Sequence, residues 1–170
     1  MERNIAILKD EDGVICNVYA RVGTPYEYYD SYTDSYTASV LSKSLDSNLI
    51  KTDNFKLYCT LKNDDWQNLD TSKENISSLT LVGGIYHSPK EEDIQELYSL
   101  YKEIEGIDNS DVDFLVGFVN NSSDFDKAIT NYRVYGKSKW EDYNGSFYGY
   151  LTVKDSGLSY EEFEECLLRT

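Results

Sequence analysis

The sequence predicts an α+β domain with a mostly antiparallel sheet and three to four helices. Two hairpin turn signals and several helix start signals occur without a regular alternation of strand and helix, which is typical of this class. The length of 170 residues suits a single globular domain over residues 1–170, with residues 1–62 as an alternative N-terminal lobe. A chain of this length buries enough surface to fold without a disulfide or a metal.

The first hairpin joins apolar runs at residues 4–8 and 14–22, with Asp12-Gly13 at its tip. A helix start signal follows, in which Thr24 is the cap, Pro25 the first helical residue and Glu27 the partner in a capping box. Spacings of three and four then define two opposite faces: Tyr29, Tyr32, Tyr36 and Val40 on one, and Glu27, Asp30 and Asp34 on the other. This phase breaks near Ala38. A strand that places Tyr32, Asp34 and Tyr36 on one face is the alternative.

The middle of the chain predicts two strands separated by a polar loop. Apolar and polar residues alternate over residues 55–62, as in a half-buried strand, and residues 63–78 are polar. Residues 79–86 read as a buried strand that contains Gly83-Gly84. A glycine pair inside a strand indicates a bulge or a close backbone approach.

The clearest helix begins at SPKE, residues 88–91. Ser88 is the expected cap, Pro89 the first helical residue and Glu91 the reciprocal partner, and Gly106 ends the helix. Its expected inner face consists of Ile94, Leu97, Tyr98, Tyr101 and Ile104.

The last third predicts a central strand, a hairpin and two short helices. The near-continuous apolar run at residues 112–119 is the expected central strand, and residues 123–131 fit a short helix. Asn144-Gly145 is the turn of a second hairpin, between residues 132–143 and 146–153. Ser159 and Glu162 cap a last helix that buries Tyr160, Phe163, Cys166 and Leu167.

Composition limits the classes of partner. The chain has 31 acidic and 16 basic residues and a net charge of −15, and residues 61–120 hold 13 of the acids and four of the bases. This balance disfavours direct binding to nucleic acid or to anionic membranes and favours a basic partner. Three widely spaced cysteines, with no apolar run of membrane-spanning length, predict a cytoplasmic protein of a reducing compartment.

No motif of a familiar chemistry is present. His87 is the only histidine, and an unfamiliar enzyme site around His87, Glu91 and the Gly83-Gly84 turn is the alternative function. Residues 108–113 resemble a calcium loop only in charge, since the glycine and the distal glutamate of that motif are missing. The sequence therefore predicts no catalytic residue, cofactor or metal site.

The candidate partner-binding residues are acidic and aromatic. Glu92, Glu96 and Glu103 lie opposite the apolar face of the helix at residues 89–104, in an outward row with gaps of roughly 6 and 10 Å. Glu91 and Asp93 flank this row. A second set lies in the tyrosine-rich segment: Glu27, Asp30 and Asp34, framed by Tyr26 and Tyr28.

These features predict an acidic binding protein or inhibitor that occludes a basic, nucleic-acid-binding surface of a partner protein. Carboxylates on a rigid element substitute for phosphates, and tyrosines add broad, stiff contact area. Size and charge are comparable to those of acidic anti-restriction and anti-CRISPR inhibitors of phages and mobile elements, although no motif of such a family is present. The alternatives are an immunity protein, a structural subunit, the enzyme at His87, or an acidic surface that serves only solubility.

Overall fold

The structure is a computed structural model that describes residues 3–9, 11, 15–21, 28–30, 32–63, 70, 72–107, 111–123 and 146–169. In chain order the elements are β1 (Arg3–Lys9), β2 (Ile15–Arg21), β3 (Tyr28–Asp30), α1 (Tyr32–Ser44), the 3-10 turn η1 (Leu49–Lys51), β4 (Phe55–Leu61), η2 (Lys73–Asn75), β5 (Ile76–Ile85), α2 (Glu91–Glu105), β6 (Asp111–Val119), β7 (Phe147–Val153), α4 (Tyr160–Glu165) and β8 (Leu167–Arg169).

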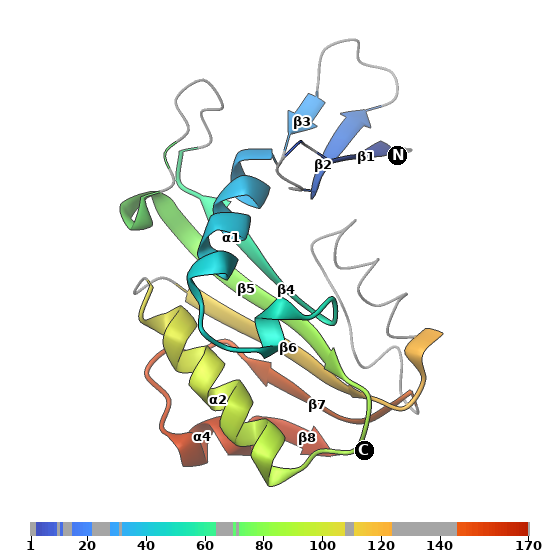
Figure 1. Cartoon of the computed structure of the whole chain (residues 1–170), viewed down its shortest axis with the longest axis vertical. Helices are drawn as coiled ribbons and strands as arrows, with labels where there is room; N and C mark the ends of the chain where they lie inside the picture. Colours follow the sequence, from blue (N-terminus) through green and yellow to red (C-terminus); the bar gives the residue numbers. More distant parts are fainter. Residues whose placement is uncertain are drawn as a thin grey trace.

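The strands form two sheets (Figure 1). The larger has the order β4-β5-β6-β7-β8, and every neighbouring pair is antiparallel except β5 and β6. These two parallel strands are joined by a crossover that contains α2, as parallel pairing requires. The smaller sheet has the antiparallel order β1-β2-β3. The predicted α+β class with a mostly antiparallel sheet is confirmed.

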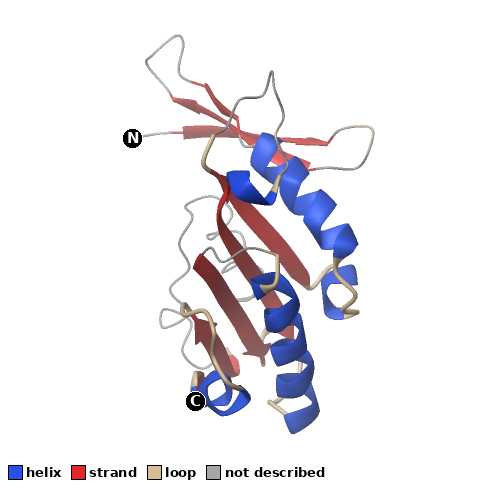
Figure 2. Ribbon diagram, turned by 90° about the vertical axis from the view of Figure 1, so that its left-hand side faces the viewer, coloured by secondary structure: helices blue, strands red, loops and turns tan. Residues whose placement is uncertain are grey.

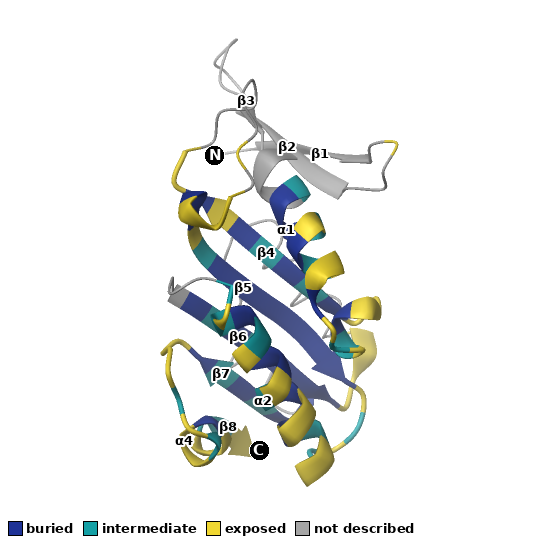
Figure 3. Cartoon of the chain, turned by 60° about the vertical axis from the view of Figure 1, so that its left-hand side comes forward, coloured by how far each residue is buried: buried dark blue, intermediate teal, exposed yellow. Residues whose placement is uncertain are grey.

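Helices α1 and α2 cover one face of the larger sheet (Figure 2). The core lies between them and the sheet, and Figure 3 shows the sheet as almost continuously buried. β6 supplies Val112, Phe114, Val116 and Phe118 to this core, all fully buried, as expected for the central strand. The ring of Phe163 in α4 packs on Phe114 at 6.0 Å between centroids, which places α4 on the same face. α1 contacts both β4 and β2, so it connects the two sheets.

The tyrosine-rich segment departs from the prediction. Tyr28–Asp30 is a strand rather than the start of a helix, and it pairs with β2 through Tyr19 opposite Tyr29. Because Tyr28–Asp30 is extended, Asp30 and Asp34 do not share one acidic helix face. Tyrosine fits a pleated surface well, and pairing with β2 outweighs a weak helix preference. Tyr26 and Glu27, with the predicted cap at Thr24, lie outside the described residues.

The helix begins at Tyr32 and has a different inner face from the predicted one. Thr37, Ala38 and Leu41 are buried, whereas Val40 is 41% exposed. The strand alternative for residues 32–36 is therefore wrong, and so is the predicted tyrosine face. Leu41 does not lie on the predicted tyrosine face. The inner face of α1 is the one that packs on β4, and Leu41 is buried there.

The start of β5 differs from the prediction, whereas the close approach at its glycine pair agrees with it. β5 begins at Ile76, inside the predicted polar loop, and Lys73–Asn75 forms a 3-10 turn. Gly83 faces Phe55 across the β4–β5 pair, and a Cβ atom at Gly83 would lie 2.1 Å from that ring. The close-approach reading of Gly83-Gly84 is therefore confirmed, and the pairing continues without a bulge at that point.

The first hairpin is confirmed by the pairing of β1 with β2, although its tip at Asp12-Gly13 lies outside the described residues. Of the second hairpin the structure describes only β7. The predicted helix at residues 123–131 and the Asn144-Gly145 turn lie almost wholly outside the described part of the chain.

Candidate functional site

The start of α2 differs from the prediction by two residues. The helix begins at Glu91 with Lys90 as its cap, and the Asp93 carboxylate accepts a hydrogen bond of 2.9 Å from the Lys90 N–H. Ser88 is not the cap, because the Asp93 carboxylate accepts from the N–H of Lys90, three residues before it, and this places the first helical residue at Glu91. The first turn thus holds three acids next to the positive end of the helix dipole.

The capping of α4 is confirmed. The Ser159 hydroxyl accepts from the Glu162 N–H at 3.3 Å, and the Glu162 carboxylate accepts from the Ser159 N–H at 2.8 Å. These hydrogen bonds with Ser159 hold the pKa of Glu162 below its ordinary value. The predicted inclusion of Leu167 in this helix is wrong, because α4 ends at Glu165 and Leu167 pairs with Leu151 in the sheet.

An aromatic cluster joins α4 to α2. The Tyr98 ring lies 5.4 Å from Tyr160 and 5.3 Å from Phe163, both edge-on. Tyr101 lies 5.2 Å from Phe163. Tyr101 and Phe163 are fully buried, so the two helices share one piece of core.

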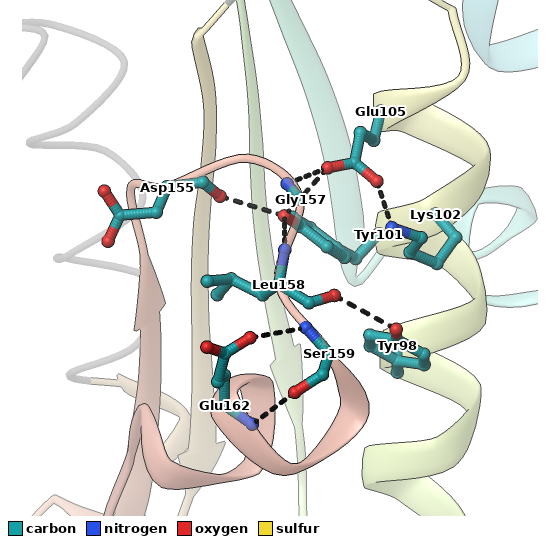
Figure 4. A network of polar contacts seen from close by, with 9 residues as sticks. All are labelled: Tyr98, Tyr101, Lys102, Glu105, Asp155, Gly157, Leu158, Ser159 and Glu162. Atoms are coloured by element: carbon teal, nitrogen blue, oxygen red, sulfur yellow. Dashed lines mark hydrogen bonds and ion pairs between the residues drawn. The ribbon is translucent and has the colours of Figure 1, made fainter.

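Hydrogen bonds add a second connection, which we call the α2–α4 clamp: Tyr98, Tyr101 and Glu105 of α2 with residues 155–158 (Figure 4). The Tyr98 hydroxyl donates to the Leu158 carbonyl at 3.1 Å, and the Tyr101 hydroxyl donates to the Asp155 carbonyl at 2.9 Å. The Tyr101 oxygen also accepts from the Leu158 N–H at 3.3 Å. The clamp therefore fixes the segment that leads into α4.

Glu105 is the charged member of the clamp. Its carboxylate accepts a hydrogen bond from the Gly157 N–H and shares the single hydroxyl proton of Tyr101 with the Asp155 carbonyl, and it forms an ion pair with Lys102. Burial alone would raise the pKa of Glu105, but the bonds from Lys102, Gly157 and Tyr101 together hold it below its ordinary value. Burial raises the pKa of Tyr101. Glu105 is therefore charged and Tyr101 neutral at pH 7.

Acids from both helices gather around Tyr160. We call Glu91, Glu161 and Glu164 the acidic seam; all three are exposed, and their charges act on the hydroxyl of Tyr160. Burial raises the pKa of Tyr160, and the negative charges of Glu164, Glu91 and Glu161 raise it further. The buried Tyr160 hydroxyl has no hydrogen-bond partner in the structure.

The predicted outward row on α2 is present only in part. Glu92 and Glu96 are exposed, one helical turn apart. Glu103 is half-buried, and its carboxylate accepts from the backbone N–H groups of Asp46 at 2.9 Å and Ser47 at 3.4 Å. Glu103 therefore fastens the chain that follows α1 to the side of α2.

The remaining predicted site residues are scattered. Asp93 is occupied as a helix cap. Tyr28 and Asp30 belong to β3, which pairs with β2, and Asp34 belongs to α1, whose main contacts are with β4 and β2. These three residues therefore stand on elements that do not pack mainly on α2, and Tyr26 and Glu27 lie outside the described residues.

His87 lies on the surface at the junction of β5 and α2. Its Nδ1 is 2.9 Å from the Ser88 carbonyl, which makes Nδ1 the protonated nitrogen, and 3.7 Å from the Asp93 carboxylate. The side chain is 43% exposed. Asp93 already accepts the Lys90 N–H, so this geometry is that of a helix-start residue rather than of a histidine held against a nucleophile.

A shallow surface depression lies beside the clamp, lined by Lys102, Glu105, Gly106, Ser156 and Gly157. Its two charged groups already form an ion pair with each other, which leaves no free charge to hold a ligand. Among the described residues no group of histidine, cysteine or carboxylate side chains is arranged to hold a metal ion.

The acids of α4 were not among the predicted site residues. Glu161, Glu162, Glu164 and Glu165 stand in a single run of five residues, which is a visible charge signal. What the sequence did not show is that this run lies beside the start of α2, about 70 residues earlier in the chain.

Comparison with known protein families, curated proteins and solved structures gives no match for this chain. Among the described helices, none has the length and apolar character needed to cross a bilayer.

Proposed function

We propose that the protein is an acidic binding protein that occludes a basic surface of a partner protein, and that the acidic seam is the centre of its contact surface. The single observation that carries this proposal is the packing of α2 on α4 through Tyr98, Tyr160 and Phe163, with exposed glutamates on both helices: Glu91 on α2, and Glu161 and Glu164 on α4. In the described part of the chain, Lys102 forms its ion pair with Glu105 and His87 lies 3.7 Å from the Asp93 carboxylate, so the seam acids have no basic partner among these residues.

Rigidity supports a binding role over a merely solvated surface. Exposed ion pairs contribute only about 0–1 kcal/mol each, partly because long side chains and mobile elements must be ordered first. The aromatic cluster and the α2–α4 clamp hold both helices in place before any partner arrives. A fixed array also attracts a basic partner over a distance and accelerates the encounter.

A nucleic-acid-binding surface is the kind of basic target that such an array fits. Lysines and arginines that bind phosphates are spaced for a regular series of negative charges. Glu92 and Glu96, exposed on the outer face of α2, extend the negative surface beyond the seam. An inhibitor of a nucleic-acid-processing enzyme, of the kind that phages or mobile elements direct against host defence, would use the surface in this way.

The proposal is tested by capture of partners from cells of the native source with three forms of the chain. The first is the unchanged protein and the second carries Glu91→Gln, Glu161→Gln and Glu164→Gln. The third is a matched control with the same change in charge at exposed acids elsewhere: Asp46→Asn, Asp53→Asn and Glu74→Gln.

We expect a basic partner that the seam variant loses and the control variant retains, because the seam acids contact it and the three control acids do not. Salt near 0.5 M, where the Debye length is about 4–5 Å, should release the partner, and duplex DNA or RNA should compete for it. A partner that is retained equally by all three forms, or that resists both salt and nucleic acid, would contradict the proposal.

A further inference from the structure

Among the described strands, β8 is the last of the larger sheet, and its outer edge is not paired with any of them. β8 pairs with β7 through Leu151 opposite Leu167, Tyr150 opposite Leu168 and Gly149 opposite Arg169. In the described part of the chain no strand pairs with its other side (Figure 1). Backbone groups along such an edge are free to pair with an added strand.

The two sides of this edge differ in chemistry. Leu168 is 54% exposed and shares a sheet face with its cross-strand neighbour Tyr150, whose ring packs on the small apolar cluster of Val82, Val119 and Phe147. Leu167 faces the opposite way, with Leu151 of the main core. The edge therefore offers an apolar contact on the face away from the helices.

On the face of the helices, the element next to this edge, α4, is acidic. α4 contacts β8, and the two lie together at one end of the molecule (Figure 3). Glu161, Glu164 and Glu165 are exposed on α4, against one basic residue, Arg169, on β8 itself. An added strand would meet carboxylates on one side and Leu168 on the other.

We propose that β8 is a docking edge for an extended basic segment of the partner, in which lysine or arginine alternates with an apolar residue. The strand period of two would direct the basic side chains toward α4 and the apolar ones toward Leu168. This inference rests on the proposed function and describes how the same partner is held.

A second copy of the chain fits this edge less well. Pairing of β8 with β8 of another copy would bring two sets of α4 glutamates to one interface, and each copy has a net charge of −15. Like charges at close range oppose such an assembly. Charge complementarity therefore favours a basic strand.

The test uses a defined probe, an acetylated and amidated heptapeptide of alternating lysine and valine, at low salt. Its control is the same peptide with N-methyl groups on alternate residues, which keeps the charge but removes the hydrogen-bond donors of one edge. Leu168→Lys is the variant of the protein, and Val40→Lys is its matched control, since Val40 is an exposed aliphatic residue on α1.

We expect the unmodified peptide to slow amide hydrogen exchange in residues 167–169 and to bind at least about tenfold more tightly than the N-methylated one. Leu168→Lys should weaken binding by a similar factor, and Val40→Lys should not. Equal binding of both peptides, or unchanged exchange in β8, would overturn the docking edge. A dimer that depends on Leu168 in size-exclusion chromatography would also overturn it.

These outcomes are separable from the proposed function. If the seam variant loses the captured partner but the peptide test fails, the acidic seam remains the proposed contact surface. Only the proposal that the partner pairs with β8 is then rejected.

Discussion

Two tyrosine hydroxyls at the α2–α4 contact have opposite surroundings. The Tyr101 hydroxyl bonds to Asp155, Leu158 and Glu105, whereas the buried Tyr160 hydroxyl has no partner. A buried polar group without a hydrogen bond costs stability, and a satisfied one contributes to it. The two residues therefore allow one chemical change to be tested in both situations.

We expect Tyr101→Phe to lower the free energy of unfolding by about 1–3 kcal/mol, because it leaves the Asp155 carbonyl and the Leu158 N–H without their partner. Tyr160→Phe should be neutral or stabilising by up to about 1 kcal/mol, since it removes an unsatisfied group. Urea unfolding measures both. Equal losses in the two variants would mean that the clamp does not depend on the Tyr101 hydroxyl.

At this scale the sequence predicts which residues are buried better than it predicts what they bind. Tyr98 and Tyr101 were placed on the inner face of α2 from their spacing, and Tyr101 is fully buried. Their hydroxyl partners lie in residues 155–158, more than 50 residues away. The spacing also predicts an outward position for Glu103. Its partners, the Asp46 and Ser47 N–H groups, belong to a distant turn that the spacing within α2 cannot reveal.

At the scale of elements, Glu105 of α2 binds the Gly157 N–H in the segment that leads into α4. The folded pKa of Glu105 is below its ordinary value, so its contribution to stability is present above the pKa of an unfolded glutamate, about 4.3. That contribution is lost as the pH falls through the folded pKa.

We therefore expect Glu105→Gln to lower the free energy of unfolding by about 1–2 kcal/mol at pH 7, with a difference that shrinks as the pH falls below about 4. Urea unfolding of both forms across this range measures the difference. Glu96→Gln is the matched control, since Glu96 is an exposed glutamate of the same helix that has no partner among the described residues. A difference that is constant with pH would show that the loss is one of packing rather than of charge.

The elements that the sequence predicted well are those with strong internal patterns. β4, β6, α2 and the first hairpin follow from alternation, apolar runs and turn residues. β3 and β8, with three residues each, have no pattern of their own and exist because β2 and β7 offer them an edge. The sequence could therefore name the acids of α2 but could not place them beside α4, or show that α4 is followed by an open edge strand.

At the scale of the whole molecule, charge acts on folding and on binding with opposite signs. A net charge of −15 repels itself more in the compact state than in the unfolded chain. The same excess would strengthen attraction to a basic partner. Screening shortens the reach of both effects, from about 30 Å at 10 mM salt to about 8 Å at 150 mM.

We therefore expect the free energy of unfolding to rise between about 10 and 200 mM sodium chloride, while the complex with a basic partner weakens over the same range. Urea unfolding and equilibrium binding, measured in the same buffers, give the two slopes. The control triple Asp46→Asn, Asp53→Asn and Glu74→Gln lowers the net charge, so it should reduce the dependence of the unfolding free energy on salt. It should leave most of the salt dependence of binding unchanged. A stability that falls with salt would show that local pairs such as Lys102 with Glu105 outweigh the overall repulsion, and that the acids are already balanced within the fold.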